Sequence, residues 1–232
     1  MATQVLALIP ARGGSKSIPR KNLQFLHGLP LIAHTIKTAI DAASINRVVV
    51  STDDAEIADR SREYGAEVLM RPAHLAGDET PMAVVVRYTL DQLKETERYA
   101  PDVLVLLQPT SPLRDADDVE RAMQLFHQND CAALVSVTPV KHHPSWMYTL
   151  TGNRLQPFLE TELPSRRQEL TPLYCLNGAI YVIRSAEFYR GNSLVPPGAC
   201  AFIMSAEHSL DIDEPGDLVV AEAILRARGK ER

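Results

Sequence analysis

A pair of glycines, Gly13 and Gly14, stands among cations near the start of the chain. Adjacent glycines let backbone amides turn inward and approach phosphate oxygens closely. The cations of the same segment, residues 10–22, are Arg12, Lys16, Arg20 and Lys21. Their charge can offset much of the charge of a triphosphate, and the segment matches neither the P-loop nor the GxGxxG pattern. The spacing therefore favours a phosphate-binding loop of another kind over a solvated basic turn.

Two carboxylates, Asp211 and Asp213, stand two positions apart near the other end of the chain. In extended backbone, residues i and i+2 face the same side, so both carboxylates could bind one cation. Mg²⁺ is usually held by carboxylates together with the phosphates of a substrate. The alternative is a pair of solvated acids before the last helix, with Asp213 or Asp217 capping that helix.

Neutral hydrogen-bonding groups follow a continuous apolar run in the segment 108–112, QPTSP. Its two prolines stiffen the turn, while Gln108 and Ser111 offer an amide and a hydroxyl. Such a turn suits the recognition of hydroxyl or amide groups of a sugar. A purely structural turn is the alternative.

The elements that would position these groups alternate between strand and helix. Apolar runs predict strands at 5–9, 47–51, 67–70, 103–107 and 133–137, and helical spacing predicts helices at 32–43, 55–64, 82–93 and 116–129. This alternation indicates an α/β fold with a mostly parallel sheet that helices cover on both faces. Ligands of such sheets bind beyond the carboxyl ends of the strands. Two strands, 178–184 and 201–204, and a helix, 217–228, complete the expected domain.

The segment 138–173 interrupts the alternation, because it is rich in proline, histidine and arginine. Such a stretch inside an α/β domain predicts a projecting arm or a functional excursion. Its cations include Lys141, Arg166 and Arg167, and arginine binds carboxylates bidentately. His142 and His143 point apart in extended chain and have no third ligand nearby, so a solvated pair is favoured over a metal site.

Composition excludes several classes of protein. The formal charge of −5 gives no basic field for duplex nucleic acid. No apolar run is long enough to span a bilayer, and the first residues lack the cationic start of a signal peptide. Cys131, Cys175 and Cys200 are few and widely spaced, so neither a zinc site nor a disulfide framework is indicated. We expect free, mostly buried thiols in a reducing cytoplasm.

The string IPARGGSKSIPRKN, residues 9–22, resembles the signature of the CMP-sialic acid synthetase family, the N-acylneuraminate cytidylyltransferases and their legionaminic- and pseudaminic-acid relatives. The loops of CMP-Kdo synthetases and of sugar-1-phosphate nucleotidylyltransferases differ from it. The resemblance covers nearly the whole chain, and within the loop residues 17–20 are more similar to the legionaminic type than to the sialic type. The other matching segments, in order, are 51–54 (STDD), 71–72 (RP), 107–114 (LQPTSPLR), 166–168 (RRQ), 177–181 (NGAIY) and 211–213 (DID).

The resemblance implies a Rossmann-like three-layer nucleotidyltransferase fold, a single domain over 1–232 with an inserted dimerisation arm at about 139–175. It also implies transfer of CMP from CTP to the anomeric hydroxyl of a nonulosonic acid, with release of pyrophosphate, by a homodimer. The alternatives are a CMP-Kdo-type or other sugar nucleotidylyltransferase, and a non-catalytic protein that binds CTP or a CMP-sugar.

Roles for individual residues follow from the same resemblance. The residues expected to bind CTP are Arg12, Gly13, Gly14, Ser15, Lys16, Lys21, Asn22, Arg71 and Thr80. Those expected at the sugar are Gln108, Ser111, Lys141, Arg166 and Arg167. A lysine and an arginine reach from the arm of the partner subunit, and Lys141 and Arg166 fit these places, with the adjacent Arg167 as the alternative to Arg166. Catalysis would rest on Arg12, Lys21 and Asp211, and Mg²⁺ on Asp211 and Asp213. Asp78 and Thr80 either border the cytidine or cap the helix expected from Met82.

Overall fold

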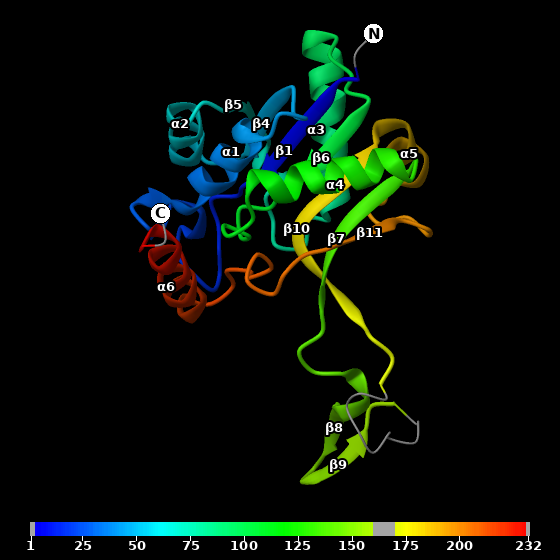
Figure 1. Ribbon diagram of the computed structural model, residues 1–232. Coiled ribbons are helices and arrows are strands. Elements are labelled where there is room, and N and C mark those ends of the chain that lie inside the picture. Colours follow the sequence, from blue (N-terminus) through cyan, green and yellow to red (C-terminus); the bar gives the residue numbers. More distant parts are fainter. Residues whose placement is uncertain (1–2, 160–169, 231–232) are drawn as a thin grey trace.

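Seven strands form the central sheet of the part of the chain that this computed structural model describes, residues 3–159 and 170–230. Their order is β11-β7-β10-β6-β1-β4-β5, and only β10 runs antiparallel to its neighbours (Figure 1). The strands are β1 (Val5–Pro10), β4 (Arg47–Thr52), β5 (Glu67–Met70), β6 (Val103–Leu106), β7 (Ala133–Pro139), β10 (Tyr174–Arg184) and β11 (Cys200–Ile203). The expected mostly parallel sheet is confirmed.

Helices cover both faces of this sheet because its central strands are apolar on both sides. All six residues of β1 are buried, and alternate side chains face opposite layers. Ala7 and Ile9 belong to one core cluster with α1 (Leu31–Asp41), α2 (Ala55–Glu63) and α4 (Ala116–Gln128). Leu6 and Leu8 belong to the other, with α3 (Met82–Glu97) and α5 (Ser185–Gly191). The three-layer fold is thereby confirmed.

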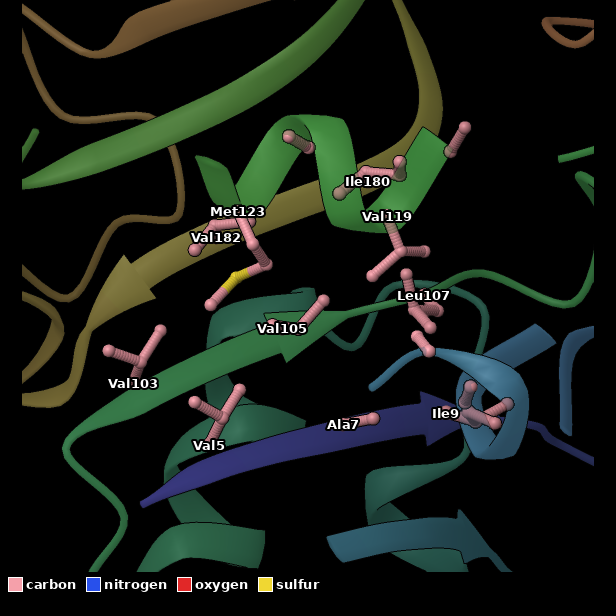
Figure 2. Close-up of a cluster of buried hydrophobic side chains, with 14 of the residues drawn as sticks. Val5, Ala7, Ile9, Val103, Val105, Leu107, Val119, Met123, Ile180 and Val182 are labelled. Carbon is pink, nitrogen blue, oxygen red and sulfur yellow. The ribbon is translucent and has the colours of Figure 1, made fainter. Parts of the chain in front are cut away.

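Figure 2 shows the first of these layers, where side chains of β1 and β6 meet α4. Val5 and Ala7 lie on the same side of the sheet as Val119 and Met123 of α4. Fully burying one such aliphatic side chain stabilises the fold by roughly 1.5–3 kcal/mol. These layers hold the carboxyl ends of β1 and β6 rigidly side by side.

A third cluster joins the two ends of the chain. The short hairpin of β2 (Phe25–Leu26) and β3 (Leu29–Pro30) packs near α6 (Pro215–Lys230). The cluster beneath it contains Ile18, Leu26 and Ile212, all nearly inaccessible to solvent. This packing brings the loop after β1 beside the segment that carries Asp211 and Asp213.

The helices and strands expected from apolar periodicity are present, within a few residues at their ends. The hairpin β2–β3 and the short helix α5 were not expected, because elements of two to seven residues carry too little periodicity to be seen. Among residues 3–159 and 170–230, no helix is long and apolar enough to cross a membrane.

The expected projecting arm is present. Beyond the sheet, β7 and β10 continue as a two-stranded stem in which Tyr174 pairs with Pro139 (Figure 1). The stem carries a 3₁₀ turn, Pro144–Trp146, and a hairpin of β8 (Tyr148–Thr151) and β9 (Arg154–Pro157). His142 is exposed as expected, whereas His143 is partly buried, with ring nitrogens 3.0 Å from Ser145 Oγ and 3.2 Å from the Thr171 carbonyl.

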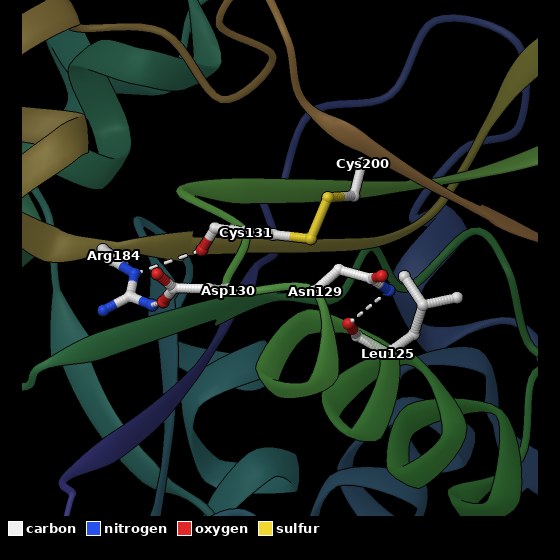
Figure 3. The surroundings of a disulfide bond; sticks show 6 residues. All are labelled: Leu125, Asn129, Asp130, Cys131, Arg184 and Cys200. Atoms are coloured by element: carbon white, nitrogen blue, oxygen red, sulfur yellow. Dashed lines mark hydrogen bonds and ion pairs between the residues drawn. A yellow bond between two sulfur atoms is a disulfide. The ribbon is translucent and has the colours of Figure 1, made fainter.

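The expectation of three free, mostly buried thiols was wrong. A disulfide joins Cys131 to Cys200 across 69 positions (Figure 3). Cys175 is free but exposed. The parallel pairing of β11 with β7 brings the two cysteines together, with their Cα atoms 6.2 Å apart. The positions of the cysteines along the chain do not show which strands become neighbours in the sheet, so the sequence could not reveal this pair. In the chain-entropy view, closing a loop of this length contributes roughly 4 kcal/mol.

The loop after β1 packs tightly against the start of α2. Asp54 caps that helix, because its Oδ1 accepts the N–H groups of Glu56 and Ile57 at 3.0 Å. A Cβ added at Gly13 would lie 2.6 Å from Asp54 Oδ2, whereas one added at Gly14 would meet nothing within 4 Å. Only the first glycine of the pair is therefore required by a close contact within the chain.

We predict that Gly13→Ala destabilises the protein and that Gly14→Ala, the matched control, does not. Displacing the Asp54 cap costs about 1–2 kcal/mol, which lowers the melting temperature by roughly 2–8 °C in a domain of this size. Thermal unfolding of the two ligand-free variants measures the difference. Equal melting temperatures for the two variants would show that the Gly13–Asp54 contact does not constrain the loop.

Candidate active site

A cleft of about 340 Å³ opens at the carboxyl ends of β1, β5 and β6. The chain proceeds from β1 to β4 and β5 on one side and then returns to β6 on the other, so the cleft lies at a topological switch point. Its lining comes from the loop after β1, from residues 71–85, from the turn after β6 and from the segment before α6. The lining residues on which the argument below depends are Arg12, Gly14, Ser15, Lys21, Asn22, Arg71, Asp78, Thr80, Gln108, Thr110, Asp211 and Asp213.

Lys21 ties the loop after β1 to the segment before α6. The side chain is nearly buried, and its Nζ donates to the Ile212 carbonyl at 2.7 Å and pairs with Asp213 Oδ1 at 3.1 Å. Asn22 is also nearly buried, and its Nδ2 donates to the Arg12 carbonyl at 3.0 Å. Lys21, Asp213 and the nearby Asp211 all line the cleft, so it holds a cation and two carboxylates.

Asp78 holds the two cations at the mouth of the loop. Its carboxylate lies 2.5 Å from Arg12 Nη1 and 2.7 Å from Lys16 Nζ. The Lys16 ammonium, and after it the Arg12 guanidinium, hold the pKa of Asp78 below its usual range. The alternative in which Asp78 or Thr80 caps α3 was wrong, because the N-cap residue is Pro81 and no side chain caps that helix.

Arg71 supplies a buried cation at the end of β5. It is 6% exposed, and its Nη1 donates to the Ser51 carbonyl at 3.2 Å. Burial lowers the pKa of Arg71, an effect that Asp53, 4.0 Å from Nη2, opposes. The other contact of Asp53 is the N–H of Gly13, at 3.1 Å. The backbone N–H of Gly13 is therefore hydrogen-bonded to Asp53, whereas its neighbours Gly14 and Ser15 line the cleft.

The turn after β6 presents one of its two expected sugar contacts. Gln108 lines the cleft, and no residue in the described part of the chain hydrogen-bonds its side-chain amide. Ser111 is fully buried behind the lining, and its Oγ has no hydrogen-bond partner among the described residues. Thr110 lines the cleft instead, although the sequence did not single it out.

The carboxylates of Asp211 and Asp213 both line the cleft. Burial raises the pKa of Asp211; Asp213 raises it further, whereas Thr110 and Lys21 lower it. Asp211 Oδ1 is buried and has no hydrogen-bond partner among residues 3–159 and 170–230. An orphaned carboxylate oxygen beside a second carboxylate fits a hard divalent cation, for which oxygen ligands are preferred.

A second group with metal-binding residue types lies outside the cleft. The ligand atoms of Asp115, Asp118 and His208 lie within 4.8 Å of one another. Asp115 and Asp118 form the capping box of α4, and His208 Nδ1 lies 2.5 Å from Asp118 Oδ2. Because these oxygens already serve the helix start and the histidine, the cleft carboxylates are the better cation ligands.

Several expected site residues lie elsewhere. Lys16 is exposed at the rim beside Asp78, and Arg20 turns away to Asp54 and Glu56 at 2.8 and 2.6 Å. Lys141 lies in the arm, outside the cleft lining. Arg166 and Arg167 lie outside the described residues.

Other lining residues were not expected from the sequence. They are Pro10, Leu75, Ala76, Gly77, Met82, Val85 and Pro109. Most of them are apolar or lack a side chain that does chemistry, so only their position, beside strand ends, could have revealed them.

Known proteins provide an independent comparison. The model of the family described as cytidylyltransferase matches residues 6–199. A CMP-N,N'-diacetyllegionaminic acid synthase from Legionella pneumophila is 36% identical over 96% of both chains. A pseudaminic acid cytidylyltransferase from Campylobacter jejuni is 31% identical over 95% of this chain and 96% of its own. An N-acylneuraminate cytidylyltransferase from Streptococcus agalactiae is 34% identical over 92% of this chain, which spans 51% of that longer protein.

Solved structures share the fold at lower identity. A CMP:2-keto-3-deoxy-manno-octonic acid synthetase in complex with CTP aligns with a TM-score of 0.73 at 19% identity, over 97% of this chain and 100% of that one. A 4-diphosphocytidyl-2C-methyl-D-erythritol synthase aligns with a TM-score of 0.71 at 13% identity, over 97% and 99% of the two chains. The fold expected from the sequence is thus found among nucleotidyltransferases, and the chain belongs to the cytidylyltransferase family, with the CMP-sialic, legionaminic and pseudaminic acid synthetases as its relatives.

Proposed function

We propose that the protein transfers CMP from CTP to the anomeric hydroxyl of a nonulosonic acid and releases pyrophosphate. The observation that carries the proposal is the convergence of Arg12, Lys21, Asp211 and Asp213 on one cleft at the switch point of the sheet. The match of a CMP-N,N'-diacetyllegionaminic acid synthase to 96% of the chain supports the class of sugar.

The reaction requires positioning and charge neutralisation more than covalent help. The anomeric oxygen forms a bond to the α-phosphorus, the bond to the bridging oxygen breaks, pyrophosphate leaves with the electron pair, and the proton of the hydroxyl passes to solvent. Arg12, Lys16 and Lys21 bind the triphosphate, and the buried Lys21 stabilises charge on the oxygens that gain it. Arg71 and Thr80 border the nucleoside, and Asn22 orients the loop through the Arg12 carbonyl.

Asp211 and Asp213 are the residues that would hold Mg²⁺. When bound there, the ion supplies positive charge to phosphate oxygens. The chain's own part is to keep two carboxylates together at the cleft, Asp211 partly buried and Asp213 exposed, with the cation Lys21 against Asp213.

The sugar is proposed to lie between Gln108 and the arm of a partner subunit in a homodimer. The arm has exposed apolar side chains, among them Met147, Leu150, Leu155 and Phe158, which are 44–70% exposed. Lys141, with Arg166 or Arg167, would bind the sugar carboxylate. We also place the protein in the cytoplasm, where CTP is made, without contacts to nucleic acid or membrane.

The proposed function is tested by pyrophosphate release from CTP and Mg²⁺ with a panel of sugars. We predict release with at least one of N-acetylneuraminic, legionaminic and pseudaminic acids, and none with Kdo or a hexose phosphate. Release with Kdo alone would move the protein to the CMP-Kdo type. Binding of CTP without release for any sugar would identify a non-catalytic nucleotide-binding protein.

We predict that Asp211→Asn lowers kcat/KM by at least about 100-fold and raises the half-saturating Mg²⁺ concentration, because it removes a charged ligand from the ion. The matched control is Glu214→Gln, which removes the same charge from an exposed side chain outside the cleft lining. Steady-state rates over a Mg²⁺ titration measure both. Near-normal activity of Asp211→Asn at low Mg²⁺ would remove the metal assignment.

We predict that Asp78→Asn lowers the KM for CTP by roughly 2- to 10-fold, since the triphosphate no longer competes with two ion pairs of modest strength. The control is Glu79→Gln, the adjacent exposed acid, which lies outside the lining of the cleft. A higher KM for CTP in Asp78→Asn, or an equal fall in both variants, would contradict the idea that Asp78 occupies the phosphate-binding cations.

A further inference from the structure

A buried arginine lies directly behind the turn after β6. Arg114 is 2% exposed and is among the largest fully buried side chains of the described residues. Its Nη1 donates to the Ala179 carbonyl at 2.7 Å, and its Nη2 donates to Thr35 Oγ1 at 2.9 Å. Burial lowers the pKa of Arg114 to about 10. A buried guanidinium is costly to desolvate, and Arg114 Nε has no hydrogen-bond partner among the described residues, so the burial of this side chain requires an explanation beyond filling space.

Arg114 lies where the regular pairing of β10 fails. The last pair between β10 and β6 is Tyr181 with Leu106, and the pairing of β10 with β7 shifts register between Leu176 and Tyr181. Past this point the carbonyl groups of Ala179 and Gln108 lose their ladder partners. The guanidinium of Arg114 spans the gap, because it donates to both of them.

Three donors converge on the carbonyl of Gln108. Arg114 Nη1, Thr35 Oγ1 and the N–H of Ser111 each lie 3.4 Å from it. Thr35 is itself fully buried on α1 and also accepts from Arg114. The backbone carbonyl of Gln108 therefore has three long hydrogen bonds, all from residues buried behind the cleft.

The side-chain amide of Gln108 lies in the space that Gly178 leaves. Gly178 has a φ of +72°, and a Cβ added to it would lie 3.1 Å from Gln108 Oε1. No described residue hydrogen-bonds this amide, so its direction depends on its backbone anchor and on the space that Gly178 leaves. A group that reads a ligand must be held within a fraction of an ångström by its surroundings.

We infer that Arg114, with Thr35 and Gly178, is a positioning residue that aims the amide of Gln108 at the sugar. The inference rests on the proposed function, in which Gln108 contacts the sugar. It makes the recognition of the sugar depend on a cation that never reaches the cleft. Within the described part of the chain, Arg114 makes no hydrogen bond to the loop after β1, so CTP binding is expected to stay independent of it.

The test compares Thr35→Val with Thr38→Val. Both residues are buried on α1, but the Thr38 hydroxyl donates to the backbone carbonyl of Arg114 at 3.1 Å and does not contact Gln108. We predict that Arg114→Lys and Thr35→Val raise the KM for the sugar about tenfold, the equivalent of one hydrogen bond, with the KM for CTP within about twofold. Thr38→Val should leave both KM values unchanged.

A double-mutant cycle with Gln108→Ala separates positioning from general support. If Arg114 acts through Gln108, the sugar KM of the Gln108→Ala enzyme does not rise further when Thr35→Val or Arg114→Lys is added. Additive effects would overturn the inference. So would variants that lose kcat and melting temperature while both KM values stay unchanged, since that pattern reports only stability.

Two further outcomes distinguish a failure of the role proposed for Gln108 from a failure of the positioning inference. An unchanged sugar KM in the single variant Gln108→Ala would contradict the proposed role of Gln108. A raised sugar KM in Gln108→Ala, with no change in Thr35→Val or Arg114→Lys, would sink the positioning inference and leave the proposed function standing. If Arg114→Lys does not fold, Thr35→Val carries the test. Gly178→Ala is expected to raise the sugar KM as well, because its Cβ, 3.1 Å from Gln108 Oε1, requires the amide to shift by a few tenths of an ångström.

Discussion

The bond between Lys21 and the segment before α6 is the interaction on which the candidate site depends. It joins two residues 191 positions apart, the ammonium of Lys21 and the carbonyl of Ile212. The apolar cluster of Ile18, Leu26 and Ile212 lies beneath it, so the hydrophobic effect brings the two ends of the chain together. A buried ammonium without a partner would cost several kcal/mol, which makes this junction specific as well as close.

Every cation of the cleft in the described structure lies beside a carboxylate. Arg12 has Asp78, Lys21 has Asp213, and Arg71 has Asp53 at a longer distance. A triphosphate that binds the loop therefore replaces these carboxylates as the partner of the cations, instead of binding unpaired cations. Such exchange keeps a strongly cationic loop compatible with folding, and it reserves the strongest attraction for a ligand with several negative charges.

Local sequence patterns predicted most of the strands and helices around this site, and its phosphate-binding loop. Runs such as the six buried residues of β1 identify strands, and the glycines among cations identify the phosphate loop. What the patterns could not show depends on which strands become neighbours. The pairing of β7 with β11 makes the Cys131–Cys200 disulfide, and the start of α2 turns Arg20 away from the cleft.

The same limit applies within a single motif. Gly13 and Gly14 cannot be distinguished by residue type, but only Gly13 lies against Asp54, a residue at the start of another element. Likewise, Gln108 and Ser111 are equally suited to a sugar by type, and the turn buries Ser111 while it leaves Gln108 in the cleft. Residue type defines what a side chain can do, and the neighbouring elements decide whether it reaches the ligand.

The antiparallel strand β10 connects the arm to the cleft. Its first residues, Tyr174 to Leu176, pair with β7 in the stem, and its last residues pair with β6 beneath the cleft. Between them, the left-handed turn at Gly178 interrupts the ladder, and interruptions of this kind bend a strand. One irregularity thus lies between the stem and the sheet and leaves the space that the Gln108 amide occupies. The break in the sheet is therefore part of the site, because a side chain at position 178 would enter the space beside the Gln108 amide.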